Sequence, residues 1–330
     1  MSEFRMPSLG ADMEAGTLVA WHKSPGDELR RGDTIAAVDT DKGVIDVEVF
    51  HEGVIEELLV QPGTRVPVDA PLARIRAAEE GPPRPGPLQA EEAKEHTQPA
   101  LPPVAAAADH TARMRRTIAA AMARSKREIP HYYLWTSIDL DRALRWLAGV
   151  NAGRPIARRL LPGVLLLKAT ALALEELPEF SAVWEADRVV LRRPAHVGAA
   201  IALRGGGLVV LALHDTASRS LDDLMAGLAE LTSRARSGRM RSSELADSTI
   251  TVTSLGDRGV DGVLGVIHPP QVALVGFGRI VERPLAVEGQ AVVRPVVTAS
   301  LAADHRASDG HRGGLFLDAI DRLLQEPENL

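Results

Sequence analysis

The sequence predicts a multidomain fold: a small all-β domain, a flexible Pro/Ala-rich linker and a larger two-layer α/β sandwich built on a mixed sheet. A length of 330 residues exceeds one ordinary core, and 45% hydrophobic residues supply apolar material for two. One internal segment departs sharply in composition, and the hydrophobic period differs on its two sides. We therefore place the domains at 1–78 and 111–330, with a linker at 79–110.

An internal echo organises the N-terminal domain. Pro25-Gly26 and, 37 residues later, Pro62-Gly63 each precede a short strand-like run. Such repeated turns and runs predict two similar half-sheets packed face to face. Between them, apolar and acidic residues alternate over 45–49, the pattern of a half-buried strand. This arrangement puts Asp41-Lys42-Gly43 at the tip of a hairpin.

The linker at 79–110 holds seven of the 22 prolines, together with acidic residues and alanines and hardly any large apolar side chain. A segment of this kind is semi-rigid and would span about 100 Å at ~3.1 Å per residue if wholly polyproline-like. Residues 1–78 carry 8 Lys+Arg against 14 Asp+Glu, a net charge of −6, and the linker carries −4. Because the whole chain is −6, the C-terminal domain is +4.

The C-terminal domain mixes helical and strand-like periods. Met114, Ile118 and Met122 recur at helical spacing in a helix that ends before Pro130, and 131–139 is strand-like. Further helices are predicted at 164–177, 221–231 and 315–324, and further strands at 196–202, 208–213, 249–254, 271–276 and 293–302. No Gly-rich phosphate loop accompanies them, which favours a mixed-sheet sandwich over a doubly wound nucleotide fold.

Composition excludes several classes of function. The absence of cysteine excludes disulfides, thiolate metal sites and a cysteine nucleophile, and we expect no metal. With 3% aromatic residues and no Lys/Arg stripe, the chain is not expected to bind nucleic acid. No apolar run is long enough to span a bilayer, and the N-terminus lacks a basic region followed by an apolar run. We expect a soluble cytoplasmic protein without membrane contact.

By itself, a lysine on a turn is ordinary solvated surface. Around Lys42, however, four motifs resemble the lipoyl domains of 2-oxo acid dehydrogenase complexes: Met6-Pro7-Ser8-Leu9-Gly10, Gly16-Thr17-Leu18-Val19-Ala20-Trp21, Pro25-Gly26-Asp27 and Val38-Asp39-Thr40-Asp41-Lys42. The resemblance covers essentially all of 1–78 and implies that Lys42 is amide-linked to lipoate. The similar biotinyl domains carry Met on both sides of their lysine, whereas Asp41 and Gly43 flank this one.

Residues 111–330 resemble, from end to end, the catalytic domain of the dihydrolipoamide acyltransferases of those complexes. The motifs that carry this resemblance are Ser125-Lys126-Arg127-Glu128-Ile129-Pro130-His131, Thr249-Ile250-Thr251-Val252-Thr253, Gly259-Val260-Asp261, Pro269-Pro270-Gln271 and Asp304-His305-Arg306-Ala307-Ser308-Asp309-Gly310. The family implies an α/β sandwich resembling chloramphenicol acetyltransferase. It also implies transfer of an acyl group from S-acyl-dihydrolipoyl-lysine to coenzyme A, the second substrate.

His305 is the predicted general base. An isolated histidine in a loop is more often structural, but an imidazole beside a thiol takes the proton as the sulfur attacks. In the family, the equivalent histidine removes the thiol proton of coenzyme A, or of dihydrolipoamide in the reverse direction. His131 and His214 are not assigned to catalysis.

Two further residues take their roles from the resemblance. Thr253 occupies the family's Ser/Thr position, whose hydroxyl stabilises the oxyanion, although a threonine alone more often fills a strand. Asp309 resembles the carboxylate that sets local charge and loop geometry together with an arginine, although in isolation it suits a helix N-cap. The predicted site is therefore Lys42, Thr253, His305 and Asp309.

The sequence also departs from the family. The linker shows no peripheral subunit-binding domain, the module through which relatives bind a thiamine-dependent 2-oxo acid decarboxylase and dihydrolipoamide dehydrogenase. These enzymes remain the expected partners. The expected assembly is a homotrimer that shares its sites between subunits, with a larger core left open. The acyl group, whether acetyl, succinyl or branched-chain, is also open. The alternative is an inactive lipoyl-bearing structural subunit of such a complex.

Overall fold

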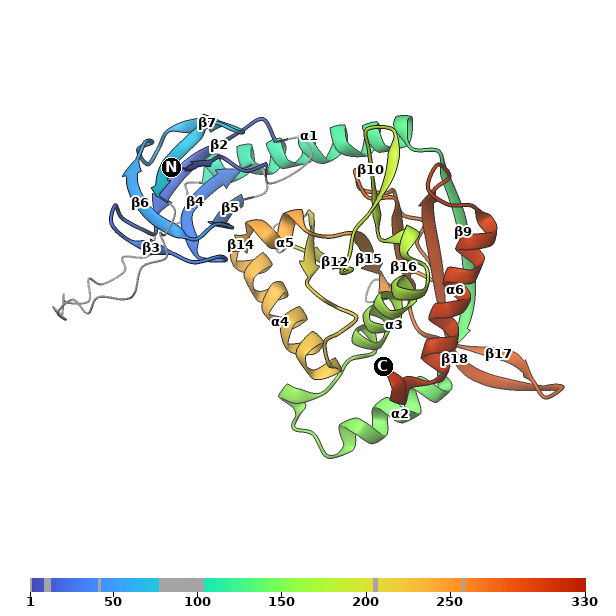
Figure 1. Cartoon of the computed structure of the whole chain (residues 1–330). Coiled ribbons are helices and arrows are strands. Elements are labelled where there is room, and N and C mark those ends of the chain that lie inside the picture. The colour runs from blue at the N-terminus through green and yellow to red at the C-terminus, as the bar shows by residue number, and fades with distance from the viewer. Residues whose placement is uncertain (1, 9–12, 41–42, 77–103, 204–206, 257–258) are drawn as a thin grey trace.

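The computed structural model shows a β-rich unit beside a larger α/β unit (Figure 1). It describes residues 2–8, 13–40, 43–76, 104–203, 207–256 and 259–330. Most of the predicted linker, including all of 79–103, therefore lies outside the described residues. Among the described residues, no helix combines the length and apolar character needed to cross a membrane.

The β-rich unit consists of two antiparallel sheets that enclose one apolar core. Its strands are β1 (Ser2–Arg5), β2 (Ala15–Trp21), β3 (Glu28–Leu29), β4 (Thr34–Thr40), β5 (Gly43–Glu48), β6 (Gly53–Leu58), β7 (Arg65–Pro67) and β8 (Pro71–Arg76). One sheet has the order β1-β8-β6-β3 and the other contains β5-β4-β2-β7. Fully buried Leu18, Ile35, Ile45 and Leu72 fill the space between them. The predicted pair of half-sheets is confirmed.

The hairpin of β4 and β5 supports the predicted lipoyl position. The two strands pair from Thr34 opposite Glu48 to Thr40 opposite Gly43. The Thr40 hydroxyl donates to the Gly43 carbonyl at 3.0 Å, and Gly43 has φ +116°, a backbone conformation that suits glycine. Lys42 itself lies outside the described residues. The described strands therefore enter and leave position 42 at the end of a hairpin.

The α/β unit contains the remaining elements. Its helices and 3₁₀ turns are α1 (Val104–Glu128), α2 (Asp141–Ala152), η1 (Ile156–Arg158), α3 (Pro162–Glu176), η2 (Pro178–Phe180), α4 (Leu221–Ser237), α5 (Ser242–Ala246), α6 (Gly310–Gln325) and η4 (Pro327–Asn329). Its strands are β9 (His131–Asp139), β10 (Ala182–Glu185), β11 (Arg188–Leu191), β12 (Val197–Ala202), β13 (Leu208–Leu213), β14 (Met240–Arg241), β15 (Ile250–Ser254), β16 (Ala273–Phe277), β17 (Val281–Val287) and β18 (Gln290–Asp304).

A seven-stranded mixed sheet forms the base of the α/β unit. Its order is β13-β12-β15-β16-β18-β17, and β9 pairs with the second half of β18. β12, β15 and β16 run parallel to one another, whereas β18 is antiparallel to β16. Helices α3, α4 and α6 contribute to the core above this sheet, where Phe180 and Phe316 stack at 4.6 Å. The predicted mixed-sheet sandwich is confirmed.

The predicted limits of helices and strands agree well with the observed limits where the hydrophobic period of the sequence is clear. The strand predicted at 131–139 coincides with β9. Helix α1 begins at Val104, inside the segment predicted as linker, because the alanine run at 105–108 has high helix propensity. The sequence reading also missed α2 and the exposed hairpin partner β17.

An ion pair ties α5 to the edge strand β13. His214 follows β13, and its Nε2 lies 2.9 Å from a carboxylate oxygen of Asp247, the residue that ends α5. The hydrogen bond from Asp247 raises the pKa of His214. The neighbouring His196 packs edge-on at 4.9 Å, and burial lowers its pKa. The pKa values of the two rings are therefore shifted in opposite directions.

We predict that His214→Asn lowers stability more at acidic than at alkaline pH. Because the folded-state pKa of His214 is raised, its contribution is fully present below its unfolded value and is lost as pH rises through the folded value. With both partners about one-third exposed, the contribution is at most about 1 kcal/mol. Thermal unfolding at about pH 5.5 and about pH 8.5 measures it. Asp247→Asn should reproduce the loss, and a pH-independent difference would contradict the assignment.

We also predict that Gly276→Ala in β16 destabilises the α/β unit. A Cβ there would lie 2.8 Å from the Val263 carbonyl oxygen and 2.7 Å from the Ser300 hydroxyl, so backbone must move. The expected loss is roughly 1–3 kcal/mol in the free energy of unfolding. Gly314→Ala in α6 is the matched control, because nothing lies within 4 Å of its Cβ. Equal melting temperatures for the two variants would refute the crowding argument.

Candidate active site

The loop after β18 is built around a buried carboxylate. Asp304 ends the strand with 0% exposure and accepts bonds from the Arg306 amide at 2.9 Å and from the Arg306 guanidinium at 2.7–3.1 Å. Its backbone carbonyl also accepts from the Ala307 and Ser308 amides. A buried charge is stable only when it is paired and hydrogen-bonded, so this loop has one favoured path. That path sets the direction of His305.

His305 leaves the loop as an exposed side chain. Its amide donates to the Pro130 carbonyl at 3.0 Å, which ties the loop to the start of β9. Its ring meets the ring of Tyr132 edge-on at 5.2 Å, and the Tyr132 hydroxyl is 2.8 Å from the Ser308 hydroxyl. Burial raises the pKa of Tyr132, so this tyrosine stays protonated near neutral pH. The imidazole is therefore supported from one side and reachable from another.

Asp309 is the N-cap of α6. Its side chain accepts from the Arg312 amide at 2.9 Å, the bond that most lowers the pKa of this carboxylate, and the charge of His305 lowers it further. The Arg312 guanidinium pairs with Glu179 rather than with Asp309. Asp309 thus fixes the start of α6 just after the histidine loop and remains ionised.

Thr253 lies half-buried near the end of β15. It stands opposite Gly276 of β16, which in turn stands opposite Ser300 of β18. The space over Gly276 in this row is filled by Val263 and by the Ser300 hydroxyl. The Ser300 hydroxyl is occupied by the Val263 carbonyl, so it does not compete for the same role.

One chain does not bring Thr253 and His305 together. His305 lies five residues beyond Ser300, or roughly 17 Å along the strand at ~3.3 Å per residue, and two strand spacings, roughly 10 Å, across the sheet. Asp309 stays with the histidine, and Lys42 lies outside the described residues. Within one chain, His305 and Asp309 therefore lie together and apart from Thr253.

Sequence reasoning missed the residues that support the histidine loop. Arg306 pairs with Asp304 and lies 4.4 Å from the centre of the Trp184 ring, a cation–π contact. Tyr132 was read as an ordinary strand residue. The sequence Asp304-His305-Arg306 indicates an ion pair around the histidine, because an acidic and a basic residue flank it. Which of the two charged side chains is buried depends on packing and cannot be told from the sequence.

His131 and His214, which were not assigned to catalysis, have structural contacts. His131 bonds the Ile129 carbonyl through Nδ1 at 2.9 Å and accepts the Ile267 amide at Nε2 at 3.1 Å, so both ring nitrogens are engaged. His214 is held by Asp247. Neither ring is presented as a free base.

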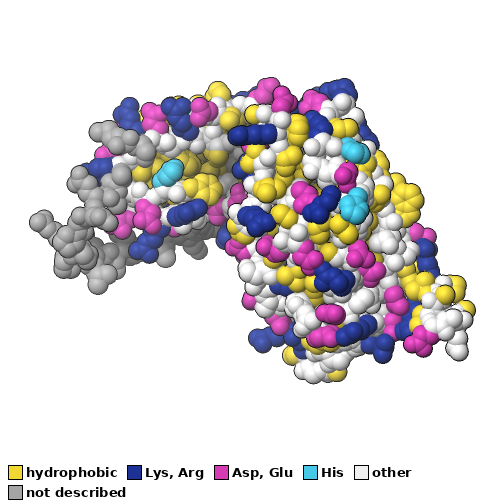
Figure 2. Space-filling view, turned by 45° about the vertical axis from the view of Figure 1, so that its right-hand side comes forward, with side chains coloured by type: hydrophobic (Ala, Val, Ile, Leu, Met, Phe, Trp, Pro, Cys, Tyr) yellow, Lys and Arg dark blue, Asp and Glu magenta, His cyan; other side chains and the backbone are white. Residues whose placement is uncertain are grey.

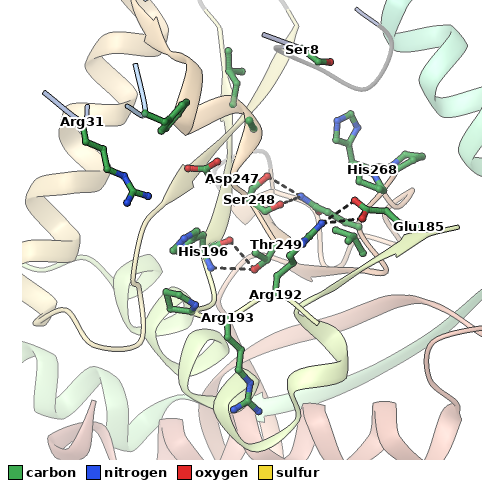
Figure 3. Close-up of a pocket in the computed structure, with 18 residues that line it drawn as sticks. Ser8, Arg31, Glu185, Arg192, Arg193, His196, Asp247, Ser248, Thr249 and His268 are labelled. Atoms are coloured by element: carbon green, nitrogen blue, oxygen red, sulfur yellow. Dashed lines mark hydrogen bonds and ion pairs between the residues drawn. The ribbon is translucent and has the colours of Figure 1, made fainter. Parts of the chain in front are cut away.

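A cavity of about 580 Å³ lies between the two units (Figure 3). Arg31 and Phe50 of the β-rich unit face it, and His196, Asp247 and His268 line it from the α/β unit. Figure 3 shows Arg192 directed at Glu185 across its floor, at 3.0 Å. Thr253, His305 and Asp309 do not line it, so this cavity is distinct from the predicted site. Within the described residues, no cluster of His, Asp and Glu suits a metal ion.

The hairpin fits a covalently attached group. Attachment through an amide needs an accessible amine and a backbone held on both sides, which the bond between Thr40 and Gly43 and the strands β4 and β5 provide. The described flanks of position 42 therefore suit an amide-linked arm such as lipoate.

Comparison with known proteins identifies both units. Residues 106–330 match the family of 2-oxoacid dehydrogenases acyltransferase catalytic domains, and residues 2–75 match the biotin-requiring enzyme domain family. The chain is 27% identical to a dihydrolipoyllysine-residue acetyltransferase component of the pyruvate dehydrogenase complex of Staphylococcus aureus, over 99% of this chain and 98% of the relative. It is 36% identical to the lipoamide acyltransferase component of the branched-chain alpha-keto acid dehydrogenase complex of Pseudomonas aeruginosa, over 72% of this chain and 54% of the relative.

A solved structure agrees with this assignment. The dihydrolipoamide acetyltransferase of Azotobacter vinelandii superposes with a TM-score of 0.62 at 26% identity, over 70% of this chain and 98% of that one. That structure was determined to study the roles of a serine, a histidine and an asparagine in its catalytic mechanism. With the family model covering more than half of its residues, the chain belongs to the acyltransferase family of the 2-oxoacid dehydrogenase complexes and carries a lipoyl-type domain at its N-terminus.

Proposed function

We propose that the protein transfers an acyl group from S-acyl-dihydrolipoyl-lysine to coenzyme A as the core component of a 2-oxo acid dehydrogenase complex. The observation that carries the proposal is the exposed His305 ring, directed by the pairing of buried Asp304 with Arg306 and supported by Tyr132. Because the chain belongs to the acyltransferase family, acyl transfer is the reaction in which this imidazole would act.

His305 acts as the general base. A free thiol has a pKa near 8.5, so near pH 7 only a few per cent is thiolate, and a neutral imidazole takes its proton as the sulfur attacks the thioester carbonyl. The edge contact with Tyr132 orients the ring. The Asp309 carboxylate, whose pKa is lowered mainly by its bond from the Arg312 amide and further by the charge of His305, caps α6 directly after the histidine loop. In the reverse direction the same ring takes the proton of dihydrolipoamide.

Thr253 supplies the hydroxyl that stabilises negative charge on the carbonyl oxygen. Because Thr253 and His305 lie at opposite ends of the sheet in one chain, the complete site needs His305 of one subunit beside Thr253 of another. This requirement supports a homotrimer with sites between subunits. A serine and a histidine also serve catalysis in the Azotobacter relative.

Lys42 is the proposed attachment point of lipoate. When bound, lipoate supplies the dithiol that carries the acyl group as a thioester. The strands β4 and β5 flank position 42, and the Pro-rich sequence of 79–103 has the length that would let the domain reach different active sites. The acyl donor is a thiamine-dependent 2-oxo acid decarboxylase, and dihydrolipoamide dehydrogenase reoxidises the dithiol. The relatives include an acetyltransferase component and a branched-chain acyltransferase component. Acetyl, branched-chain and succinyl groups are therefore all candidates to assay.

One prediction of the proposed function concerns the site shared between subunits. We expect His305→Ala to lower the rate of acyl transfer between coenzyme A and free dihydrolipoamide by roughly 10²–10⁴, and Thr253→Ala by roughly 10²–10³. Co-expression of the two inactive variants should restore activity, because some mixed trimers pair an intact histidine with an intact threonine. Turnover with acetyl-, succinyl- and isobutyryl-CoA measures both the rates and the acyl preference.

His311→Ala is the matched control, because His311 is an exposed histidine in the first turn of α6. It should retain full activity. Undiminished transfer by His305→Ala would remove the base assignment and favour the inactive structural subunit. Failure of co-expression to restore activity would place each site within one chain.

The second prediction concerns the attachment site. Intact mass of the protein from its native host should show the lipoyl increment, and Lys42→Arg should remove it while leaving the unfolding temperature unchanged. Lys23→Arg is the control, because Lys23 pairs with Asp33 elsewhere in the domain and should keep the increment. A lipoyl increment retained by Lys42→Arg would assign the arm to another lysine.

A further inference from the structure

We infer that the β14–α5 segment (240–246) is a docking site for the chain's own lipoyl domain and holds this domain in a resting position. The docked position places the Thr40–Gly43 end of the β4–β5 hairpin away from the end of the sheet that leads to His305. The docking itself rests on contacts between described residues. Its meaning as a resting state rests on the proposed function.

Backbone pairing is the first contact. The two-residue strand β14 joins the lipoyl sheet as a fifth strand beside β5, in parallel register, with Met240 opposite Ile45 and Arg241 opposite Asp46. In the lipoyl domain alone, β5 is an edge strand with unpaired backbone groups. Addition of a strand to such an edge is a common mode of recognition, and backbone bonds supply part of its affinity.

Glu48 supplies the specific contact. Its amide donates to the Ser242 hydroxyl at 3.1 Å, and its carboxylate accepts from the Ser243 amide at 3.3 Å and from the Ser243 hydroxyl at 2.5 Å. Glu48 retains 7% exposure in this position. A buried carboxylate is costly unless donors surround it, and the Ser243 amide and hydroxyl are such donors. The contact is therefore specific to Glu48 and the two serines.

Apolar contacts join the two cores. Leu245 of α5 packs against both the lipoyl core and the core of the α/β unit. Met240 is 1% exposed, and its terminal methyl group lies 3.6 Å from the position of a Cβ built on Gly43. Charge adds to the attraction, because the N-terminal 78 residues carry −6 and residues 111–330 carry +4.

The docked orientation follows from the register. Because β5 runs parallel to β14, Gly43 lies at the Met240 end, whereas the base of the hairpin lies towards Asp247. There Arg31 and Phe50 face the cavity beside Gln271, which precedes β16. That end of β16 adjoins the end of β18 that leads to His305. The Thr40–Gly43 end of the hairpin thus lies away from the histidine end of the sheet.

The docking segment also lies at the far edge of the sheet. Helix α5 packs against β13, the edge strand, and four strand spacings of ~4.8 Å, roughly 19 Å, separate β13 from β18. Figure 2 shows the two units meeting along one side, with acidic and basic side chains intermingled on the visible face. A lipoyl domain in this position is held on the chain but away from the proposed base.

Engineered cysteines test the docking, because the chain contains no cysteine of its own. Asp46 and Arg241 are Cα partners on adjacent strands, about 4.8 Å apart, within the range that a disulfide spans. In the full-length protein, Asp46→Cys with Arg241→Cys should form an intrachain disulfide under mild oxidation. The control pair is Glu57→Cys with Arg241→Cys, because Glu57 is exposed on the other lipoyl sheet.

We expect the first pair to close at least about tenfold faster than the control, and Glu48→Lys to slow it towards the control rate. Non-reducing gels and intact mass follow the reaction. Equal rates for the two pairs would overturn the docking, and a covalent dimer as the main product would assign the site to the lipoyl domain of a second copy. Because none of these readouts uses activity, a negative result is distinguishable from failure of the proposed acyl transfer.

Discussion

The buried carboxylate of Asp304 is the interaction on which the candidate site depends. It ends β18, the strand that pairs with β9, β16 and β17, and so lies where most of the sheet converges. A charge with 0% exposure persists only if the chain wraps donors around it, and the Arg306 guanidinium and amide do so within two residues. The tight wrap leaves His305 between the two partners with its ring outward. Rigid placement of the base is thus a consequence of satisfying a neighbouring charge.

The same sheet that positions His305, the proposed base, also separates it within one chain from Thr253, the proposed oxyanion donor. Thr253 of β15 and Ser300 of β18 lie in the same row of the sheet, on either side of Gly276. His305 lies five residues beyond that row. No adjustment of loops in one chain closes a separation set by strand register. Under the proposed function, assembly therefore creates the active site, and stability of the subunit interface and catalysis are linked. The lipoyl arm is a third element that reaches this interface from a separate domain.

The sequence predicted most of the architecture because its periods are strong. The limits of β9, the two half-sheets around the echo of Pro25-Gly26 and Pro62-Gly63, and the mixed order of helices and strands all follow from local patterns. The site was predictable as a motif but not as a geometry. Whether Asp309 caps a helix or pairs with an arginine depends on α6, and whether Thr253 meets His305 depends on register. Strand β14 has only two residues, too few to show a hydrophobic period. Its pairing partner lies almost 200 residues earlier in the sequence, so no local pattern indicates the contact.

The contact between the domains has the chemistry of a reversible interface. The Glu48 carboxylate is well bonded on α5, yet in the separated domain it would be hydrated on an exposed strand face, so exchange of one set of bonds for the other has a small net free energy. Leu245 adds an apolar contact to both cores. Covalent connection raises the local concentration of the lipoyl domain enough for weak contacts to be populated. A domain that must visit several enzymes can therefore be stored on its own chain without being trapped there.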